Sequence, residues 1–450
     1  MVAKLVGSQE APTRCFDLID QAHAIPLELM RGVGSGRAEH ERQLHEELRW
    51  LYQRLYLDRR MHGAGDAAGA PGAVDWRVLE ARQLEVEQAL ERSKLLRRVA
   101  ASSGPQPRAS QLIEVLRPAE TLVEYFPVHG RWNAALVTRD RIEVLALDAS
   151  VTETYRLCQA LQIELLHVAR THPQPPSSVR TTAARAVLEQ LADRLLVPIG
   201  AAAAGADLLI APHGHLWLLP FAALSLLRSL DFTSVVQVTS LCDLQRARER
   251  PARARRQAAV LGGGDADLPS AHDELASVIG CLAQHRIEHL GDDLERRPPL
   301  EWIHIAGHGI RRDDNPYFGA IRTAHGFLSA AEIAEMDLGT VELVVLSGCE
   351  TGRGSLEIGR ELGGLTLAFL GAQARAVLSS MWPVDDAATY ELMRAFYQNV
   401  FTRGWSVGRA LHRAEIDCAR ENRARHPYYW GAFRLVGDCD PPAPLARRTA

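Results

Sequence analysis

The chain has 450 residues, enough for two or three domains of ordinary size. Hydrophobic residues make up 47% of it and charged residues 24%, values typical of a globular protein with a sizeable core. The net charge of −4 is small for this length, so the composition gives no reason to expect a nucleic acid or an anionic membrane as a direct partner.

The seven cysteines are an odd number, with no repeated spacing and no CxxC pair. This pattern argues against a disulfide framework and against a structural zinc site. No apolar run reaches the roughly 18 residues of a membrane span, and the first residues lack the apolar stretch of a signal peptide. We therefore expect a cytoplasmic protein without metal or cofactor, in which a free thiol is available for chemistry.

Residues 1–106 are predicted to form a helical N-terminal region. Apolar residues recur at helical spacing at Leu44, Leu48, Leu51 and Leu55, and again at Leu79, Val86 and Leu90. The stretch 61–73 is rich in glycine and alanine and predicts a loop between the two helices. The exposed face of this helical hairpin is charged, so it is expected either to dock a regulatory protein or a substrate, or to support the fold.

Residues 107–255 are predicted to form a second region that contains strands. Segment 121–147 predicts successive strands joined by turns at His129-Gly130 and Arg139-Asp140. A helix is expected over about 179–195. Segment 207–224 then predicts a buried strand, a turn and a second short strand.

Two histidines, His213 and His215, flank the glycine of that turn. They invite the idea of a second reactive site or a metal site. No cysteine or carboxylate lies beside them in the sequence, so we interpret them as turn residues. Charged residues at 248–257 mark the predicted boundary of this region.

Residues 256–450 alternate regularly between apolar strands and helices. The predicted strands are 258–264, 302–307, 341–348 and 376–384, and helices follow them. This alternation is typical of a doubly wound, mostly parallel sheet in an α/β protein. Parallel strands are buried on both faces, which explains why these runs lack alternating polarity.

Two of the predicted strands end on reactive side chains flanked by glycine. One ends in Gly307-His308-Gly309 and the other in Gly348-Cys349. Functional groups gather at the carboxyl ends of parallel strands, and consecutive strands are usually neighbours. A histidine close to a cysteine can take the thiol proton and activate the sulfur as a nucleophile. The backbone amides of Gly309 and Cys349 are then expected to bind the developing oxyanion.

Either residue alone would more often be a packing residue. However, the segments "IHIAGHG", "VELVVLSGCETGRG" and "AFLGAQARAVLSSMWPVDD" resemble, in order and spacing, the CHAT family of caspase-like cysteine peptidases. The resemblance places the catalytic histidine at His308 and the nucleophile at Cys349, and leaves His304 as a packing residue. It also implies an inactive caspase-like half at 107–255 that supports the protease half at 256–450.

Peptidases related to this family, the caspases and separases, cut after a charged residue. Here Asp385 and Asp386 follow the third strand, and a carboxylate there suits an arginine or lysine side chain. Trp382 is expected to form a wall of that pocket. Either aspartate can instead cap the helix that follows. Our interpretation is that one carboxylate caps and that Asp386 reads the substrate.

The resemblance implies a cysteine endopeptidase that cuts a protein substrate after arginine or lysine, and a gene nearby is one expected source of that substrate. A role in bacterial defence or regulated cell death is expected. Arg353 and Arg360, in the loop after Cys349, make self-cleavage conceivable. One alternative is a non-catalytic scaffold or adaptor that binds a partner protein. Another is a cysteine-dependent acyltransferase or other hydrolase that uses the same two residues.

Overall fold

The computed structural model describes most of the chain between residues 109 and 438 and parts of the N-terminal region. The described ranges are 13, 16–20, 23, 39–52, 54–55, 76–101, 109–172, 174–250, 257–262, 269–290, 300–307, 309–310, 319–323, 326–348, 364–421 and 426–438. Within these ranges, eleven strands form one large sheet in the order β3-β2-β1-β4-β5-β14-β13-β12-β8-β6-β7.

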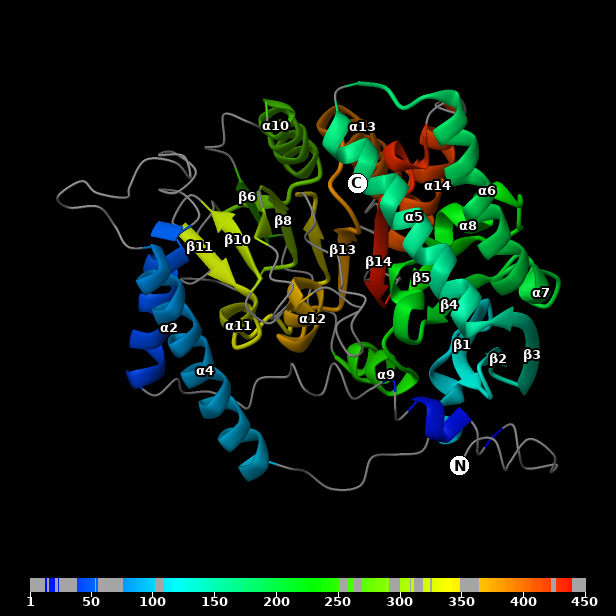
Figure 1. The fold of residues 1–450 in the computed structure, drawn as a ribbon, viewed down its shortest axis with the longest axis horizontal. Coiled ribbons are helices and arrows are strands. Elements are labelled where there is room, and N and C mark those ends of the chain that lie inside the picture. The colour runs from blue at the N-terminus through cyan, green and yellow to red at the C-terminus, as the bar shows by residue number, and fades with distance from the viewer. Residues whose placement is uncertain are drawn as a thin grey trace, which may run out of the picture.

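The strands of the first half occupy one side of this sheet (Figure 1). They are β1 (Glu120–Val128), β2 (Arg131–Val137), β3 (Ile142–Ser150), β4 (Asp207–Ala211) and β5 (Ser234–Gln237). The first three form an antiparallel meander, as the turns in the sequence predict. On the other side of β1, β4 pairs with it in parallel, and β5 pairs in parallel with β4.

The strands of the second half complete the sheet. They are β6 (Gln257–Gly262), β7 (Glu288–His289), β8 (Trp302–Ala306), β12 (Leu343–Leu346), β13 (Ala376–Ser380) and β14 (Phe433–Gly437). Pairing is parallel from β7 to β13. The mostly parallel α/β sheet that the alternating pattern predicts is therefore confirmed.

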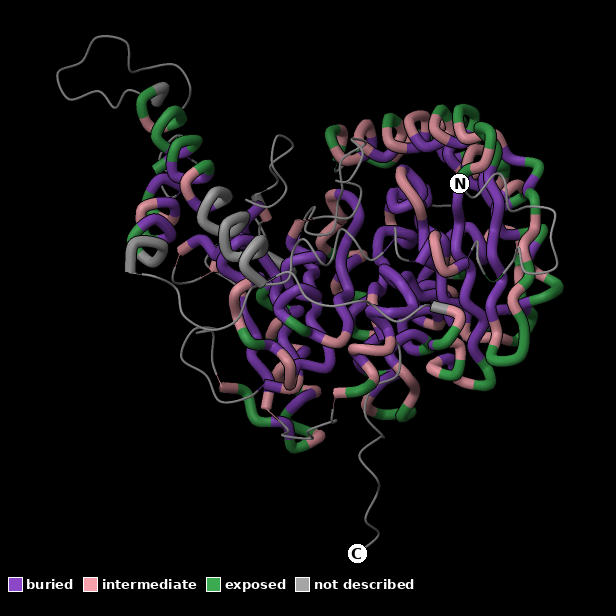
Figure 2. Tube along the Cα trace, turned by 90° about the horizontal axis from the view of Figure 1, so that it is seen from below, coloured by how far each residue is buried: buried purple, intermediate pink, exposed green. Residues whose placement is uncertain are grey.

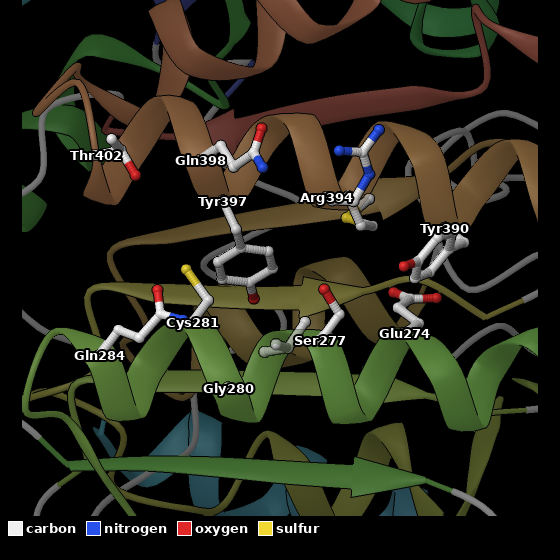
Figure 3. A pocket seen from close by; sticks show the side chains of 12 residues that line it. Glu274, Ser277, Gly280, Cys281, Gln284, Tyr390, Arg394, Tyr397, Gln398 and Thr402 are labelled. Carbon is white, nitrogen blue, oxygen red and sulfur yellow. The ribbon is translucent and has the colours of Figure 1, made fainter.

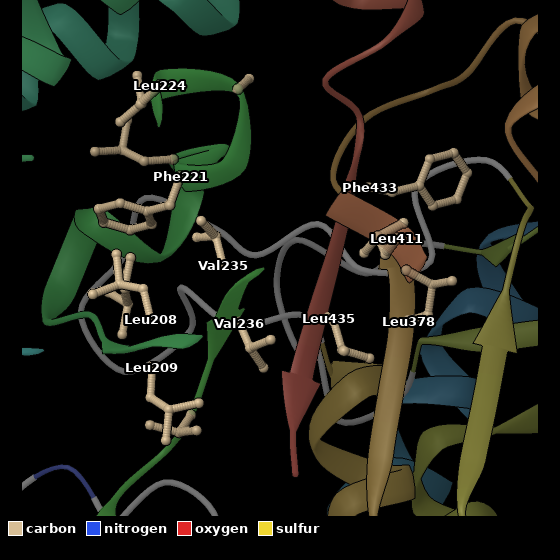
Figure 4. Packing of buried hydrophobic residues seen from close by; sticks show 14 of the residues in the cluster. Leu208, Leu209, Phe221, Leu224, Val235, Val236, Leu378, Leu411, Phe433 and Leu435 are labelled. Carbon is tan, nitrogen blue, oxygen red and sulfur yellow. The ribbon is translucent and has the colours of Figure 1, made fainter. Parts of the chain in front are cut away.

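The last strand, β14, joins the two halves. It pairs antiparallel with β13, and Val436 pairs in parallel with Gln237 of β5. Figure 4 shows side chains of β4, β5, β13 and β14 within one hydrophobic cluster, including Val236, Leu378 and Leu435. The predicted halves thus share a sheet and a core, and the domain boundary at 255/256 stays a prediction.

Helices cover both faces of the sheet. One core cluster contains residues of α5 (Val151–Thr171), α6 (Ser178–Leu195), α10 (Pro269–Gln284), α13 (Asp386–Phe401) and α14 (Val407–Glu421). The other contains residues of α11 (Ala330–Ile333) and α12 (Gly364–Gly371). Buried residues follow the strands, and exposed ones lie mainly on the outer turns of the helices (Figure 2). This two-sided burial explains the unbroken apolar runs of the strands.

The two N-terminal helices are confirmed and pack against a second, smaller sheet (Figure 1). The helices are α2 (Glu39–Tyr52) and α4 (Trp76–Ala101), and the small sheet contains β9 (Gly309–Ile310), β10 (Ala320–Thr323) and β11 (Gly326–Ser329). Leu48 and Val86 share a buried cluster with Phe327 of β11. Arg49 also pairs with the buried Glu332 at 2.6 Å.

One predicted element is wrong. The second short strand expected after Gly214 is instead a 3-10 turn, η5 (Gly214–Leu218), followed by a helix, α8 (Phe221–Leu227). A short apolar run without alternation does not distinguish a buried strand from a buried helix. Among the helices of the described ranges, none is both long and apolar enough to cross a membrane.

Candidate active site

The two strands that lead to His308 and Cys349 are neighbours in the sheet. β8 and β12 pair in parallel, with Ile303 opposite Val344 and Ile305 opposite Leu346. The backbone N–H of Ser347 extends this contact by donating to the Ile305 carbonyl at 3.0 Å. The two strands therefore end at the same edge of the sheet, as their order in the sequence predicts.

Beyond the strands, the backbones of Gly307 and Gly348 are in direct contact. A Cβ atom on Gly348 would lie 1.7 Å from the carbonyl oxygen of Gly307 and 2.9 Å from its carbonyl carbon. Real Cβ atoms do not approach backbone atoms so closely, so this position requires glycine. The glycine before Cys349 thus allows the two strand ends to approach each other.

His308 and Cys349 themselves lie outside the described residues, as does the loop with Arg353 and Arg360. The dyad and self-cleavage therefore stay predictions. Gly309 is described, and it pairs with Ile321 across the small sheet. Its predicted role as an oxyanion donor is not tested by this contact.

A serine at the end of the third strand holds the same edge. The hydroxyl of Ser380, in β13, donates to the carbonyl oxygen of Gly348 at 2.7 Å. Ser380 is fully buried. The end of β12 is therefore fixed on one side by β8 and on the other by β13.

His304, predicted to be a packing residue, lies at the centre of a buried polar network. Its Nδ1 atom is 2.9 Å from the hydroxyl of Tyr397, and its Nε2 atom is 3.0 Å from Oε1 of Glu274. The histidine is only 2% exposed. Burial and the nearby Glu274 carboxylate raise the pKa of Tyr397, so its hydroxyl stays protonated. A buried histidine needs polar partners, so a histidine within an apolar strand is the feature of the sequence that could have indicated this network.

The network borders a pocket between α10 and α13 (Figure 3). The pocket has a volume of about 380 Å³, and its lining includes Glu274, Cys281, Tyr390 and Tyr397. Cys281 is partly exposed there, and burial raises the pKa of its thiol. A thiol with a raised pKa is a poor nucleophile, so this cysteine does not replace Cys349 as the candidate.

The two aspartates after β13 have different surroundings. Asp385 caps α13, because its Oδ1 accepts from the N–H of Ala388 at 2.7 Å. Its Oδ2 lies 2.6 Å from Nε2 of His172. The capping alternative is thus confirmed for Asp385, whose two oxygens are both engaged. Asp386 is partly exposed in the first turn of the helix, and its predicted role in reading the substrate is not tested.

Trp382, the predicted pocket wall, is buried in the core that the two halves share. Its indole N–H donates to the carbonyl of Tyr428 at 3.1 Å, and 4% of the residue is exposed. The indole ring lies 3.9 Å from the point where a Cβ atom on Gly431 would be. Its role as a pocket wall stays a prediction.

The first half places a histidine and a cysteine after neighbouring parallel strands too. His213 follows β4, and Cys242 follows β5. Burial and the nearby Asp20 raise the pKa of the Cys242 thiol, so the sulfur stays neutral. Asp20 also accepts a hydrogen bond from the backbone N–H of Leu241. The chemistry of an activated nucleophile is therefore missing at Cys242.

The two histidines around Gly214 have buried partners. Nε2 of His215 lies 3.0 Å from Oγ1 of Thr154, and burial lowers the pKa of His215 to about 4. Nδ1 of His213 lies 3.3 Å from Nε2 of His23. Across the described part of the chain, no group of three or more His, Cys, Asp or Glu side chains is arranged to hold a metal ion.

Comparison with known proteins identifies the family of the chain and the proteins that share its fold. Residues 185–438 match the family model of the CHAT domain. A stretch of 110 residues is 34% identical to Tetratricopeptide repeat protein 28 of Mus musculus and, to the same extent, of Homo sapiens. The stretch covers 24% of this chain but only 4% of each of these much longer relatives.

Two solved structures of the Saccharomyces cerevisiae separase–securin complex share the fold. One has a TM-score of 0.53 at 11% sequence identity and covers 79% of this chain and 31% of the other. The second has a TM-score of 0.50 at 11% identity and covers 96% of this chain and 36% of the other. Because the family model matches more than half of its length, the chain belongs to the CHAT-domain family of proteins with a caspase-like, separase-related fold.

Proposed function

We propose that this protein is a CHAT-type cysteine endopeptidase with Cys349 as nucleophile and His308 as general base. The contact between Gly307 and Gly348 carries the proposal. Each glycine directly precedes one of the two reactive residues, and both lie at the carboxyl edge of adjacent parallel strands. Sites of α/β proteins gather at this edge.

The two residues would share one proton through the reaction. His308 takes the thiol proton of Cys349, and the sulfur attacks the carbonyl carbon of the scissile peptide bond. The electron pair of the C=O bond moves to oxygen, where the N–H groups of Gly309 and Cys349 bind the oxyanion. As the intermediate collapses, the C–N bond breaks and the amine leaves with the proton from His308. Water, deprotonated by His308, then attacks the thioester and releases the thiolate, which recovers its proton.

The substrate would be a protein cut after arginine or lysine. Asp385 is engaged in the helix cap and with His172. Asp386, which is partly exposed in the first turn of α13, is the carboxylate that we propose for the substrate side chain. A carboxylate binds a guanidinium through charge-assisted, bidentate hydrogen bonds. We further propose that cleavage takes place in the cytoplasm, in bacterial defence or regulated cell death, and that the hairpin of α2 and α4 receives a regulatory protein.

A peptidyl-arginyl chloromethyl ketone tests the proposal, because the active-site sulfur attacks its methylene carbon and chloride leaves. The native chain should be labelled at Cys349, and Cys349→Ala and His308→Ala should lose the labelling. Cys281→Ala is the matched control, because Cys281 is the cysteine with partial exposure among the described residues. Its loss should leave both labelling and peptide cleavage unchanged.

The same experiment separates the alternatives. Labelling of Cys349 without peptide cleavage, but with transfer of an acyl group to an amine, would indicate an acyltransferase. No labelling in the presence of a bound partner protein would favour the non-catalytic scaffold. Labelling that survives Cys349→Ala and disappears with Cys281→Ala would overturn the assignment of the nucleophile.

A further inference from the structure

Ser380 is the last residue of β13, and its side chain continues the hydrogen bonding of the sheet beyond the backbone ladder. The last registered pair between β12 and β13 is Leu346 with Ser379. One residue beyond Ser379, the hydroxyl of Ser380 donates to the carbonyl oxygen of Gly348 at 2.7 Å. Ser380 is fully buried, so water does not compete for this bond.

The acceptor of this bond belongs to a particular peptide unit. The carbonyl of Gly348 and the amide N–H of residue 349 are parts of one planar group. In the trans form, which residues other than proline adopt almost without exception, the N–H points opposite to the C=O. A hydrogen bond that fixes the direction of the Gly348 carbonyl therefore also fixes the direction of the N–H on its other side.

We propose that Ser380 is a positioning residue, which orients and polarises the peptide whose N–H binds the oxyanion. The inference rests on the proposed function, in which the amide of Cys349 is an oxyanion donor. Hydrogen bonds that act in series strengthen one another, so an acceptor bond at the carbonyl makes the N–H a better donor. Catalysis by such donors depends on their being aligned before charge develops. Ser380 itself would touch neither the substrate nor the sulfur.

The preceding serine provides a matched control. Ser379 is as deeply buried as Ser380, and successive residues of a strand point to opposite faces of the sheet. The hydroxyl of Ser379 lies 3.2 Å from that of Thr366 in α12, and so it has a hydrogen-bond partner of its own. Ser379→Ala therefore removes an equally buried hydroxyl without touching the Gly348 carbonyl.

The test compares ligands that need the oxyanion site with one that does not. A peptidyl-argininal is attacked by the sulfur of Cys349, its C=O pair moves to oxygen, and that oxygen then occupies the oxyanion site. With iodoacetamide, the sulfur instead attacks the carbon that carries iodine, iodide leaves, and no oxyanion forms. Cleavage of the Arg-peptide substrate gives kcat and KM, and inhibition of that cleavage gives the affinity for the aldehyde. Alkylation of Cys349 is followed by peptide mass spectrometry over a range of pH.

Ser380→Ala should lower kcat and weaken aldehyde binding by about tenfold, less than the loss of an oxyanion donor itself. KM and the pH profile of alkylation should stay as in the native chain. Ser380→Thr, which keeps the hydroxyl, should restore kcat. Ser379→Ala should behave as native.

Each other outcome has a distinct meaning. If Ser380→Ala matches the native chain in kcat and aldehyde affinity, the positioning role is wrong while the peptidase stands. If Ser380→Ala slows alkylation as much as it slows turnover, the serine supports the thiol or the local fold, and the positioning role is again wrong. If the native chain neither cleaves nor binds the aldehyde, the proposed function fails, and this inference fails with it.

Discussion

Gly307 and Gly348 are packed backbone against backbone, so that a Cβ atom on Gly348 would lie 1.7 Å from the Gly307 carbonyl oxygen. The contact lies two residues beyond the last registered pair of β8 and β12, Ile305 with Leu346. Ser380 holds the same Gly348 carbonyl from the side of β13. Three neighbouring strands thus converge on the peptide that precedes Cys349.

A methyl group at Gly348 should disrupt this contact. The clash is with backbone atoms, which cannot rotate away as a side chain can, so Gly348→Ala should cost about 1–3 kcal/mol of unfolding free energy. Gly280→Ala is the control, because a Cβ there meets no atom within 4 Å in the middle of α10. It should stabilise the protein by about 0.5–1 kcal/mol. Urea unfolding measures both, and an unchanged midpoint for Gly348→Ala would contradict the observed packing.

The two aspartates at the N-terminus of α13 should have different roles, Asp385 in stability and Asp386 in substrate specificity. Asp385→Ala removes the acceptor for the Ala388 N–H and should cost about 0.5–2 kcal/mol of unfolding free energy. Asp386→Asn should lower kcat/KM on Arg-peptides by about 10- to 100-fold, the value of a hydrogen bond to a charged group. Thermal unfolding and steady-state kinetics provide the two readouts. An undiminished preference for arginine in Asp386→Asn would remove that residue from the substrate pocket.

The hydroxyl of Tyr397 should stabilise the network around His304. Tyr397→Phe leaves Nδ1 of His304 buried without this partner, and we expect a loss of about 1–3 kcal/mol of unfolding free energy. Tyr390→Phe removes a hydroxyl from the same helix at the partly exposed rim of the pocket, where changes are usually within about 0.5 kcal/mol. Equal effects of the two substitutions in urea unfolding would show that the bond to His304 contributes little.

The ion pair between Arg49 and Glu332, which attaches the N-terminal hairpin, should contribute more to stability than the ion pair between Arg82 and Glu47 on the surface of the hairpin. Arg49→Ala takes the 2.6 Å partner from Glu332, which is buried, and should cost about 1–3 kcal/mol of unfolding free energy. Arg82 makes two parallel bonds to Glu47, but both side chains are substantially exposed. Water screens such a pair, so Arg82→Ala should have little effect. Thermal unfolding of the two variants in low and high salt measures how far each substitution destabilises the protein. A larger destabilisation by Arg82→Ala than by Arg49→Ala would contradict this prediction.

Glu124 should make stability depend on pH. Burial, together with the neighbouring Asp20, raises the pKa of this carboxyl above its usual value. At a pH between the unfolded and the folded pKa, Glu124 is therefore protonated in the folded chain and ionised in the unfolded chain. The stabilisation from that proton is complete below the unfolded pKa and is lost as the pH rises through the folded pKa. Glutamine cannot ionise, so Glu124→Gln should gain stability relative to the native protein as the pH rises from about 4 to 8.

Urea unfolding at several pH values measures this difference. The buried His23, whose pKa burial lowers to about 3, is present in both chains and so cancels from the comparison. Glu143→Gln, at a largely exposed residue of β3, is the control for replacing a glutamate by glutamine in a strand. A flat difference for Glu124→Gln would mean that its carboxyl titrates alike in the folded and unfolded chains.

The local pattern of the sequence already specifies most of the main sheet. Strands buried on both faces must be apolar throughout, so β6, β8, β12 and β13 can be recognised from composition alone. Glycines next to His308 and Cys349 mark the strand ends that must approach each other, because a local residue type meets a local steric demand. The hairpin helices α2 and α4 are equally visible from their apolar spacing.

Only the tertiary structure decides which distant segments meet. The place of β14 between β5 and β13, the partners of His304 on two separate helices, and the bond from Ser380 to Gly348 all join parts far apart in the chain. The run after Gly214 becomes helical rather than extended for the same reason, since its apolar residues suit either form until their neighbours are known. Periodicity records which face of an element is buried, but not what covers it.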